Sequence, residues 1–273
     1  MRAIRPGRGR CWRGCCHTSM APCWRGRLLL LAWTREDDFD LAARLCRHAL
    51  VVTSDERLLA EIHIRLAEFA LGSAIVIGHN VYHVVPNEVP ILFVLGLISL
   101  RLRDGGWAAM GLGWPVPWRR TVLYALAAAA IRILLGALVI DPVTARFWPP
   151  AHAPSGTNEI QGHGIVALQW LLLVWTFAAF GEEISYRGYL LRRAADVGGR
   201  SKGAYWVGVL VVSVLFGYGH YYKGPSGMVD SGMAGLVLGA AYVLSGRNLW
   251  VCILAHGFID TFGVVGAYFG WLS

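Results

Sequence analysis

Charged residues are scarce in this chain: they make up 15% of its 273 residues, whereas 56% of the residues are hydrophobic. Soluble globular proteins contain about 25% charged and about 45–50% apolar residues. So few polar side chains cannot cover the surface of a soluble domain of this length. The composition therefore excludes a single soluble domain, a disordered chain and a disulfide-stapled module, and it predicts a protein that crosses a membrane several times.

Lysine is nearly absent. Lys202 and Lys223 are the only lysines, so arginine supplies almost all of the basic side chains behind the formal net charge of +8. An excess of arginine in a membrane chain more often marks cytoplasmic loops than a nucleic-acid partner. We therefore predict the lipid bilayer as a partner and exclude nucleic acid.

Residues 1–37 lack a recognisable functional pattern. Residues 1–27 contain seven arginines and no acidic residue, together with Cys11, Cys15, Cys16 and Cys23. The spacing of these cysteines matches no zinc ribbon and no C-x-x-C pair, and the apolar run that follows is too short for the core of a signal peptide. We expect residues 1–37 to be a disordered segment without function, or translation to start later, at Met20.

Long apolar runs begin after an amphipathic region, residues 38–65, which is predicted to form a surface helix or a pair of helices. A membrane-spanning helix needs about 20 mostly apolar residues. The candidate spans are 66–85, 89–102, 121–140, 164–194, 203–220, 232–246 and 249–270. Residues 66–273 are thus predicted to form an all-α transmembrane bundle of about seven spans, without an internal repeat.

Basic loop residues predict an orientation for this bundle. One group comprises Arg101, Arg103, Arg119 and Arg120, and a second comprises Arg192, Arg193, Arg200 and Lys202. With the N-terminus inside and seven alternating spans, both groups lie in the cytoplasm, and the loop 142–162 faces outward. Together with the arginine-rich composition, this pattern predicts a multi-pass protein of a bacterial plasma membrane.

Ionisable residues inside membrane spans are candidates for a functional site because burying them in hydrocarbon is costly. Glu183 and Arg187 are four residues apart, which is a favourable spacing for an ion pair on a helix. Glu182 lies about 100° around the helix and lacks that partner. Of two adjacent acids, the uncompensated one is suited to act as a general base. A helix end at the membrane interface, where Glu and Arg are ordinary, is the structural alternative.

Two further polar positions interrupt the later apolar runs. Phe216 and His220 end one run, while His256 and Asp260 lie four residues apart in the last run, so that the carboxylate can fix the tautomer of the imidazole. An interfacial histidine and a buried structural His–Asp pair are the alternatives. Carboxylates and imidazoles on three spans predict one polar cluster that holds and activates water, which is what hydrolysis requires.

The ordered motifs Glu182-Glu183-x-x-x-Arg187, Phe216-x-x-x-His220 and His256-x-x-x-Asp260 resemble the three-motif signature of the CPBP family. This family, also called Abi, comprises the type II (glutamate) CAAX proteases and bacteriocin-processing proteins. The match runs from Phe180 to Asp260, within a predicted core at about 121–270. The resemblance implies an α-helical membrane endopeptidase that cuts near the C-terminus of a protein or peptide substrate.

The resemblance also implies roles for the motif residues. Glu182 and His220 would activate the attacking water. Glu183 would pair with Arg187, which with Phe216 would hold the first motif in place.

The third motif and the cofactor are less uniform in the family. His256 would position or polarise the scissile carbonyl. CAAX members of eukaryotes tend to have Asn at the last position, which can donate a hydrogen bond to an oxyanion. An ionised Asp260 cannot, so we assign it to orienting His256. No cofactor is expected, since no His-Glu-x-x-His helix is present; zinc held by Glu182, His220 and His256 is the alternative.

Two other functions compete with the peptidase. A family member can keep the fold and act without catalysis, as an immunity protein or as a scaffold for a sensor kinase. A proton-coupled transporter would also use intramembrane Glu, His and Asp, but the first half of the chain offers only Glu68, His79, His83 and Arg132, without a matching repeat. A lipid-modified substrate is not assumed, because prenylated proteins are not expected in bacteria.

Overall fold

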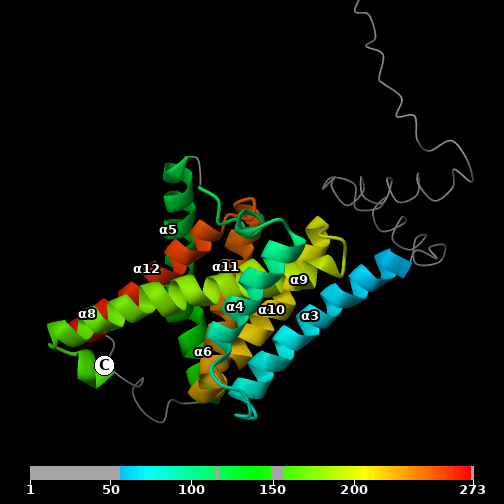
Figure 1. Cartoon of the computed structure of the whole chain (residues 1–273). Helices are drawn as coiled ribbons and strands as arrows, with labels where there is room; N and C mark the ends of the chain where they lie inside the picture. The colour runs from blue at the N-terminus through cyan, green and yellow to red at the C-terminus, as the bar shows by residue number, and fades with distance from the viewer. Residues whose placement is uncertain (1–55, 115–116, 149–156, 272–273) are drawn as a thin grey trace, which may run out of the picture. The chain divides into compact units, whose positions relative to one another are not determined.

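The computed structural model describes residues 56–114, 117–148 and 157–271, which form helices and no strand (Figure 1). The helices are α3 (Glu56–Asn80), α4 (Glu88–Arg103), η1 (Trp107–Met110), α5 (Trp118–Leu135), η2 (Gly136–Ile140), α6 (Asp141–Phe147), α7 (Thr157–Ile160), α8 (Gly164–Leu173), η3 (Val174–Glu182), η4 (Ile184–Leu190), α9 (Leu191–Asp196), α10 (Lys202–Tyr218), η5 (Tyr221–Lys223), α11 (Gly224–Leu244) and α12 (Leu249–Phe269). Among the residues described, the all-α prediction is confirmed.

The predicted segment 1–37 and most of the predicted surface helix 38–65 lie outside the described residues. From Glu56 onward, α3 continues to Asn80 without a break at position 65. Neither Gly nor Pro interrupts this stretch near that position, so the backbone has no local reason to stop there. Arg65, at the predicted boundary, is buried and forms an ion pair with Asp196 of α9.

Four helical stretches are long and apolar enough to cross a membrane: Trp118–Phe147 with 30 residues, Gly164–Asp196 with 33, Tyr221–Leu244 with 24 and Leu249–Phe269 with 21. The predicted count of about seven is not confirmed. Helix α4 has 16 residues and α10 has 17, fewer than the roughly 20 that a span needs. The first half of α3 carries charged residues among its apolar ones.

Helix α11 begins earlier than the predicted span 232–246. It starts at Gly224 and has Pro225 in its first turn. Proline is favoured there because its missing N–H would have no partner inside the helix and its fixed φ suits a helix start. Residues near 225–231, expected to form a loop because of their glycines and polar side chains, therefore extend the helix toward the second motif.

A buried core joins side chains of α3, α4, η4, α10 and α12. Helix α10 packs beside α11, while α12 packs against α5 and η3 (Figure 1). Large apolar side chains remain exposed on the outside of the bundle: Ile165 is 78% exposed, Leu138 71% and Val207 61%. Exposed aliphatic side chains on several helices suit a bundle that is surrounded by lipid.

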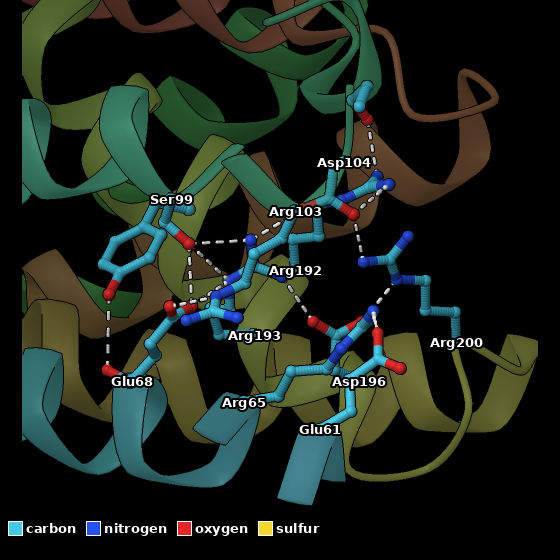
Figure 2. Close-up of polar contacts among 12 residues, drawn as sticks. Glu61, Arg65, Glu68, Ser99, Arg103, Asp104, Arg192, Arg193, Asp196 and Arg200 are labelled. Carbon is cyan, nitrogen blue, oxygen red and sulfur yellow. Dashed lines mark hydrogen bonds and ion pairs between the residues drawn. The ribbon is translucent and has the colours of Figure 1, made fainter. Parts of the chain in front are cut away.

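Arg192 and Arg193 correct the prediction that both are loop cations. They lie in α9, and Arg193 has no exposed surface. Its Nη2 lies 2.6 Å from Asp104 Oδ2, its Nη1 2.6 Å from Asp196 Oδ2 and its Nε 2.8 Å from Glu68 Oε2 (Figure 2). A count of local charge cannot distinguish such a buried cation from a solvated one, because the acids that pair with it are distant in the sequence.

Asp104 connects the two arginine-rich segments. It follows α4 and forms ion pairs with Arg192, Arg193 and Arg200, so both segments meet at one end of the bundle (Figure 2). Burial alone would raise the pKa of Asp104, but the positive charges of Arg200, Arg192 and Arg193 outweigh it and hold the pKa well below its usual range. We call Glu68, Asp104, Arg193, Asp196 and Arg200 the arginine network.

Candidate active site

The first predicted motif lies where the helical backbone widens. The π-helices η3 and η4 flank Glu183, so that hydrogen bonds over these turns run from residue i to i+5. The Ser185 hydroxyl lies 2.8 Å from the carbonyl oxygen of Gly181 and 3.2 Å from that of Val89 in α4. This contact fastens the widened turn to α4. Such π-helical turns are frequent at functional sites.

Glu183 is completely buried and holds two other elements of the site. Its Oε1 accepts a hydrogen bond from Arg187 Nη1 at 2.8 Å and lies 2.7 Å from His256 Nδ1. The Arg187 guanidinium also donates to the carbonyl oxygen of Gly235 at 3.3 Å and lies 4.4 Å from the centre of the Phe216 ring. The i,i+4 ion pair of the first motif is therefore present, and it reaches α10, α11 and α12.

Glu182, the neighbouring acid, has a different environment. It lines a cavity of about 410 Å³, and its buried Oε2 has no hydrogen-bond partner among the described residues. A buried carboxylate oxygen without a protein partner is costly unless something else binds it. The geometry thus leaves one acceptor of Glu182 available to a molecule in the cavity.

His220 lies in the turn between α10 and η5 and lines the same cavity. Its Nδ1 lies 2.9 Å from the carbonyl oxygen of Phe216, which can only accept, so the hydrogen is assigned to Nδ1 and Nε2 is the free acceptor. Burial, together with the positive charge of Lys223, lowers the pKa of His220 to about 4. At neutral pH the ring is uncharged and its Nε2 can accept a hydrogen bond.

His256 is held at both nitrogens. Its Nδ1 contacts Glu183, and its Nε2 lies 3.4 Å from Asp260 Oδ2, one turn further along α12. Helix α12 approaches η3 closely at Gly257, where an added Cβ would lie 2.5 Å from the Trp175 ring. This close approach brings His256 to the first motif, which the sequence could not indicate because Glu183 and His256 are 73 residues apart.

The cavity brings together the four predicted catalytic residues. Glu182, His220, His256 and Asp260 all line it, and so does the edge of Phe216. The Phe216 ring centre is 4.9 Å from that of His220 and 6.3 Å from that of His256. The positioning pair Glu183–Arg187 does not line the cavity and lies behind this layer. Such a cavity combines an available carboxylate, a neutral imidazole acceptor and a second, rigidly held imidazole.

Further polar residues line the cavity that sequence reasoning did not assign to it. Glu88 lies 3.3 Å from the Tyr186 hydroxyl and 3.4 Å from His79 Nε2. Arg132 forms an ion pair with Asp230. Arg132 and Asp230 interrupt apolar helices, so the rule that ionisable groups in spans are functional candidates could have found them. Glu88 gave no such signal, because an acid in the first turn of a helix is ordinary.

The alternative zinc site was tested against the positions of its ligands. Among the described residues, no group of three or more His, Cys, Asp or Glu side chains is placed to hold a metal ion. Glu182, His220 and His256 share the cavity but do not form such a ligand set. The cysteines near the N-terminus lie outside the described residues.

A comparison with protein families connects this cavity to a known class of membrane proteins. Residues 164–262 match the family model described as Type II CAAX prenyl endopeptidase Rce1-like. Searches of the curated proteins and of the solved structures found no match. The matched region contains all three motifs, from Glu182 to Asp260, and the resemblance predicted from them is confirmed. Through this region, and with its four apolar helices, the chain is an integral membrane protein of the CAAX protease family.

Proposed function

We propose that this protein is an intramembrane endopeptidase that hydrolyses a peptide bond of a membrane-associated protein or peptide with water activated by Glu182 and His220. The observation that carries the proposal is the contrast between two adjacent acids. Glu183 is engaged by Arg187 and His256, whereas Glu182 presents an unpartnered oxygen to a cavity that His220 also lines. A general base needs this availability.

In the proposed reaction, a water molecule binds between the Glu182 carboxylate and His220 Nε2. Glu182 takes a proton from the water as its oxygen forms a bond to the carbonyl carbon of the substrate. The resulting tetrahedral intermediate then collapses: the C–N bond breaks, and the proton held by Glu182 moves to the leaving nitrogen. The products are a new carboxyl group and a new amine, and no cofactor takes part.

We assign to His256 the stabilisation of the charge that develops on the carbonyl oxygen. Its Nε2 is 3.4 Å from Asp260 Oδ2, which is longer than the 2.7–3.2 Å of an ordinary N–H···O hydrogen bond. The hydrogen on Nε2 is therefore weakly engaged and can turn to a substrate oxygen. Asp260 cannot donate a hydrogen bond when ionised, so its proposed role is to orient the ring.

The substrate class follows from the family as a proposal only. The matching family is named for endopeptidases that act on prenylated CAAX proteins. For this chain we propose a protein or peptide that is cut near its C-terminus, and the test includes substrates with and without a lipid.

The test uses the full-length protein purified in detergent, with two quenched-fluorescence peptides that end in C-a-a-X and differ only in a farnesyl group. In parallel, mass spectrometry compares the peptides in membranes of cells that produce wild type or Glu182→Gln. We expect cleavage by the wild type and by Glu159→Gln, which removes an exposed acid outside the cavity. Glu182→Gln should melt like the wild type and cleave nothing.

The result also separates the competing functions. Cleavage of the farnesylated peptide alone would identify a prenylated substrate, and cleavage of both peptides would show that lipid is dispensable. If wild type and Glu182→Gln yield the same peptides in both experiments, the peptidase proposal is wrong. A non-catalytic partner role or proton-coupled transport would then be the function to pursue.

A further inference from the structure

A second cavity, of about 530 Å³, lies away from the candidate active site. It is formed where α5 begins and where α11 turns into α12, beside the segment that follows η1. It shares no lining residue with the cavity of Glu182. Ala109, next to Ala108 in its wall, accepts a hydrogen bond from Arg192 at 2.5 Å, so this cavity adjoins the end of the bundle where the arginine-rich segments meet.

Its lining carries positive charge without a balancing acid. Arg120 and Arg247 line the cavity, and no Asp or Glu does. The guanidinium of Arg120 forms no ion pair or hydrogen bond with another described residue and is exposed. Two guanidinium groups in one cavity repel each other unless an anion lies between them, so the lining favours an anionic ligand.

The position of Arg247 is fixed by its surroundings. Its φ of 65° lies in the left-handed region, which is uncommon for a residue with a side chain. Gly111 makes this conformation possible, because an added Cβ there would lie 1.8 Å from the carbonyl oxygen of Arg247. The guanidinium carbon lies 5.0 Å from the centre of the Tyr205 ring, and Leu249 N donates to Gly111 O at 3.1 Å. Backbone held in a sparsely populated region is a feature of ligand-binding positions.

Polar groups and helix ends complete the cavity. Asn248 and Thr121 both line it and are joined by a hydrogen bond of 2.9 Å from Asn248 Nδ2 to Thr121 Oγ1. Helix α5 begins beside the cavity without a side-chain cap, so its first N–H groups add partial positive charge.

Three tryptophans place this cavity at the surface of the bilayer. The ring centres of Trp114 and Trp118 are 5.0 Å apart, and those of Trp118 and Trp250 are 5.7 Å apart. Trp114 lines the cavity and is 78% exposed. Tryptophan is enriched at the level of the lipid headgroups, where its ring is partly in hydrocarbon and its N–H is near water.

We propose that this cavity binds a phosphate group, supplied by the headgroup of an anionic lipid. The guanidinium fork matches the oxygens of a phosphate, and basic pockets beside membrane helices are suited to anionic headgroups. The volume falls within the roughly 300–1,000 Å³ of small-ligand sites. Free inorganic phosphate has the same chemistry, and the test separates it from the lipid.

The test measures binding to the full-length protein in detergent by native mass spectrometry. The probes are dioctanoyl phosphatidylglycerol, dioctanoylglycerol, which lacks the phosphate, and inorganic phosphate. Wild type should bind phosphatidylglycerol and not dioctanoylglycerol. Arg120→Gln should raise the Kd about tenfold, and Arg120→Gln with Arg247→Gln should raise it further, since each lost charge-assisted contact is worth about a factor of ten.

The matched control is Arg101→Gln with Arg119→Gln. It removes the same charge from two exposed arginines that do not line the cavity, and Arg119 is the direct neighbour of Arg120. Its Kd should change less than about twofold. Binding of inorganic phosphate with the same dependence on Arg120 would identify soluble phosphate as the source.

Two results would overturn the proposal: absence of binding by both phosphate probes, or an equal loss in the control and in the cavity variants. Arg120 has no contact that folding requires, so Arg120→Gln decides the question even if Arg247→Gln lowers stability.

Discussion

The arginine network and the candidate active site both bury charge in this bundle, but they use it differently. In the arginine network each carboxylate is shared by several guanidinium groups: Asp104 contacts three and Asp196 contacts three (Figure 2). In the active-site cavity, Glu182 keeps an oxygen without a partner, and His220 keeps a free acceptor. Charges that are fully paired stabilise a structure, whereas a charge left available can do chemistry.

Glu183 and Arg187 connect the two uses. They are paired as completely as the arginine network, with side-chain exposures of 0% and 2%, yet they contact the imidazole that lines the cavity. The comparison therefore predicts three kinds of variant: loss of activity alone, loss of activity with stability, and loss of stability alone.

The largest expected effect on activity belongs to Glu182→Gln. The amide keeps the shape of the side chain and cannot accept the proton of water, so peptide cleavage should fall by about 10²–10⁴-fold, as for loss of a general base. The melting temperature in detergent should stay near that of the wild type, because the lost oxygen has no protein partner. A variant with normal cleavage would remove Glu182 from the mechanism.

Arg187→Ala should lose both properties. It leaves Glu183 as a buried charge without its cation, which typically costs about 3–5 kcal/mol. We expect a lower melting temperature together with loss of cleavage, since Glu183 also holds His256.

The double variant Glu183→Gln with Arg187→Met tests this reason. It removes both charges at similar volume and should recover much of the stability. Activity should not return with it, because the amide holds the His256 ring less firmly. If Arg187→Ala melts like the wild type, the pair does not contribute to stability and the comparison with the arginine network fails.

Arg193→Met should lose stability alone. The side chain is fully buried and bridges Glu68, Asp104 and Asp196, so its removal should cost about 3 kcal/mol, at the lower end for a broken buried pair because Arg200 still contacts both aspartates. The cleavage rate per folded molecule should stay unchanged, which is measured below the melting temperature of the variant.

The control for this variant is Arg101→Met, which removes an exposed arginine of α4 and should change stability by no more than about 0.5 kcal/mol. Loss of cleavage in folded Arg193→Met would mean that the two regions are coupled, and the division between them would be wrong.

The sequence predicted the active-site residues better than the arginine network, for a physical reason. Glu182, His220 and His256 interrupt long apolar runs, so each is conspicuous by itself, and their spacing repeats a family signature. Arg192 and Arg193 stand in a local group of cations, which is the pattern of a solvated loop. Only the tertiary fold brings Asp104 from 89 residues away to pair with Arg193.

The helix ends and the contact between motifs show the same limit. The helical class and the apolar runs near 121–140, 164–194 and 249–270 follow from composition over a window. The start of α11 at Gly224 depends on one proline, and the π-helical turns depend on packing against α4. The contact of Glu183 with His256 needs the close approach of α12 at Gly257, and no local pattern encodes it.

The smallest expected effect is a change in the pH dependence of stability. The folded protein holds the pKa of Asp104 below its ordinary value of 3.8, because three arginines outweigh the effect of burial. A carboxyl group with a lowered pKa contributes stability that is complete above its unfolded pKa and is lost as the pH falls toward the folded pKa. The wild type should therefore lose melting temperature between about pH 5 and pH 3, and Asp104→Asn should lose less over the same interval, from a lower starting value at pH 7.

The measurement is a series of melting curves in detergent from pH 7 to pH 3 for wild type, Asp104→Asn and Glu159→Gln, the last removing an exposed acid outside both regions. Glu159→Gln should follow the wild type. Equal slopes for wild type and Asp104→Asn would show that the arginines do not favour the ionised carboxylate. The arginine network would then not stabilise through charge pairing, and its contrast with the cavity of Glu182 would have to rest on packing alone.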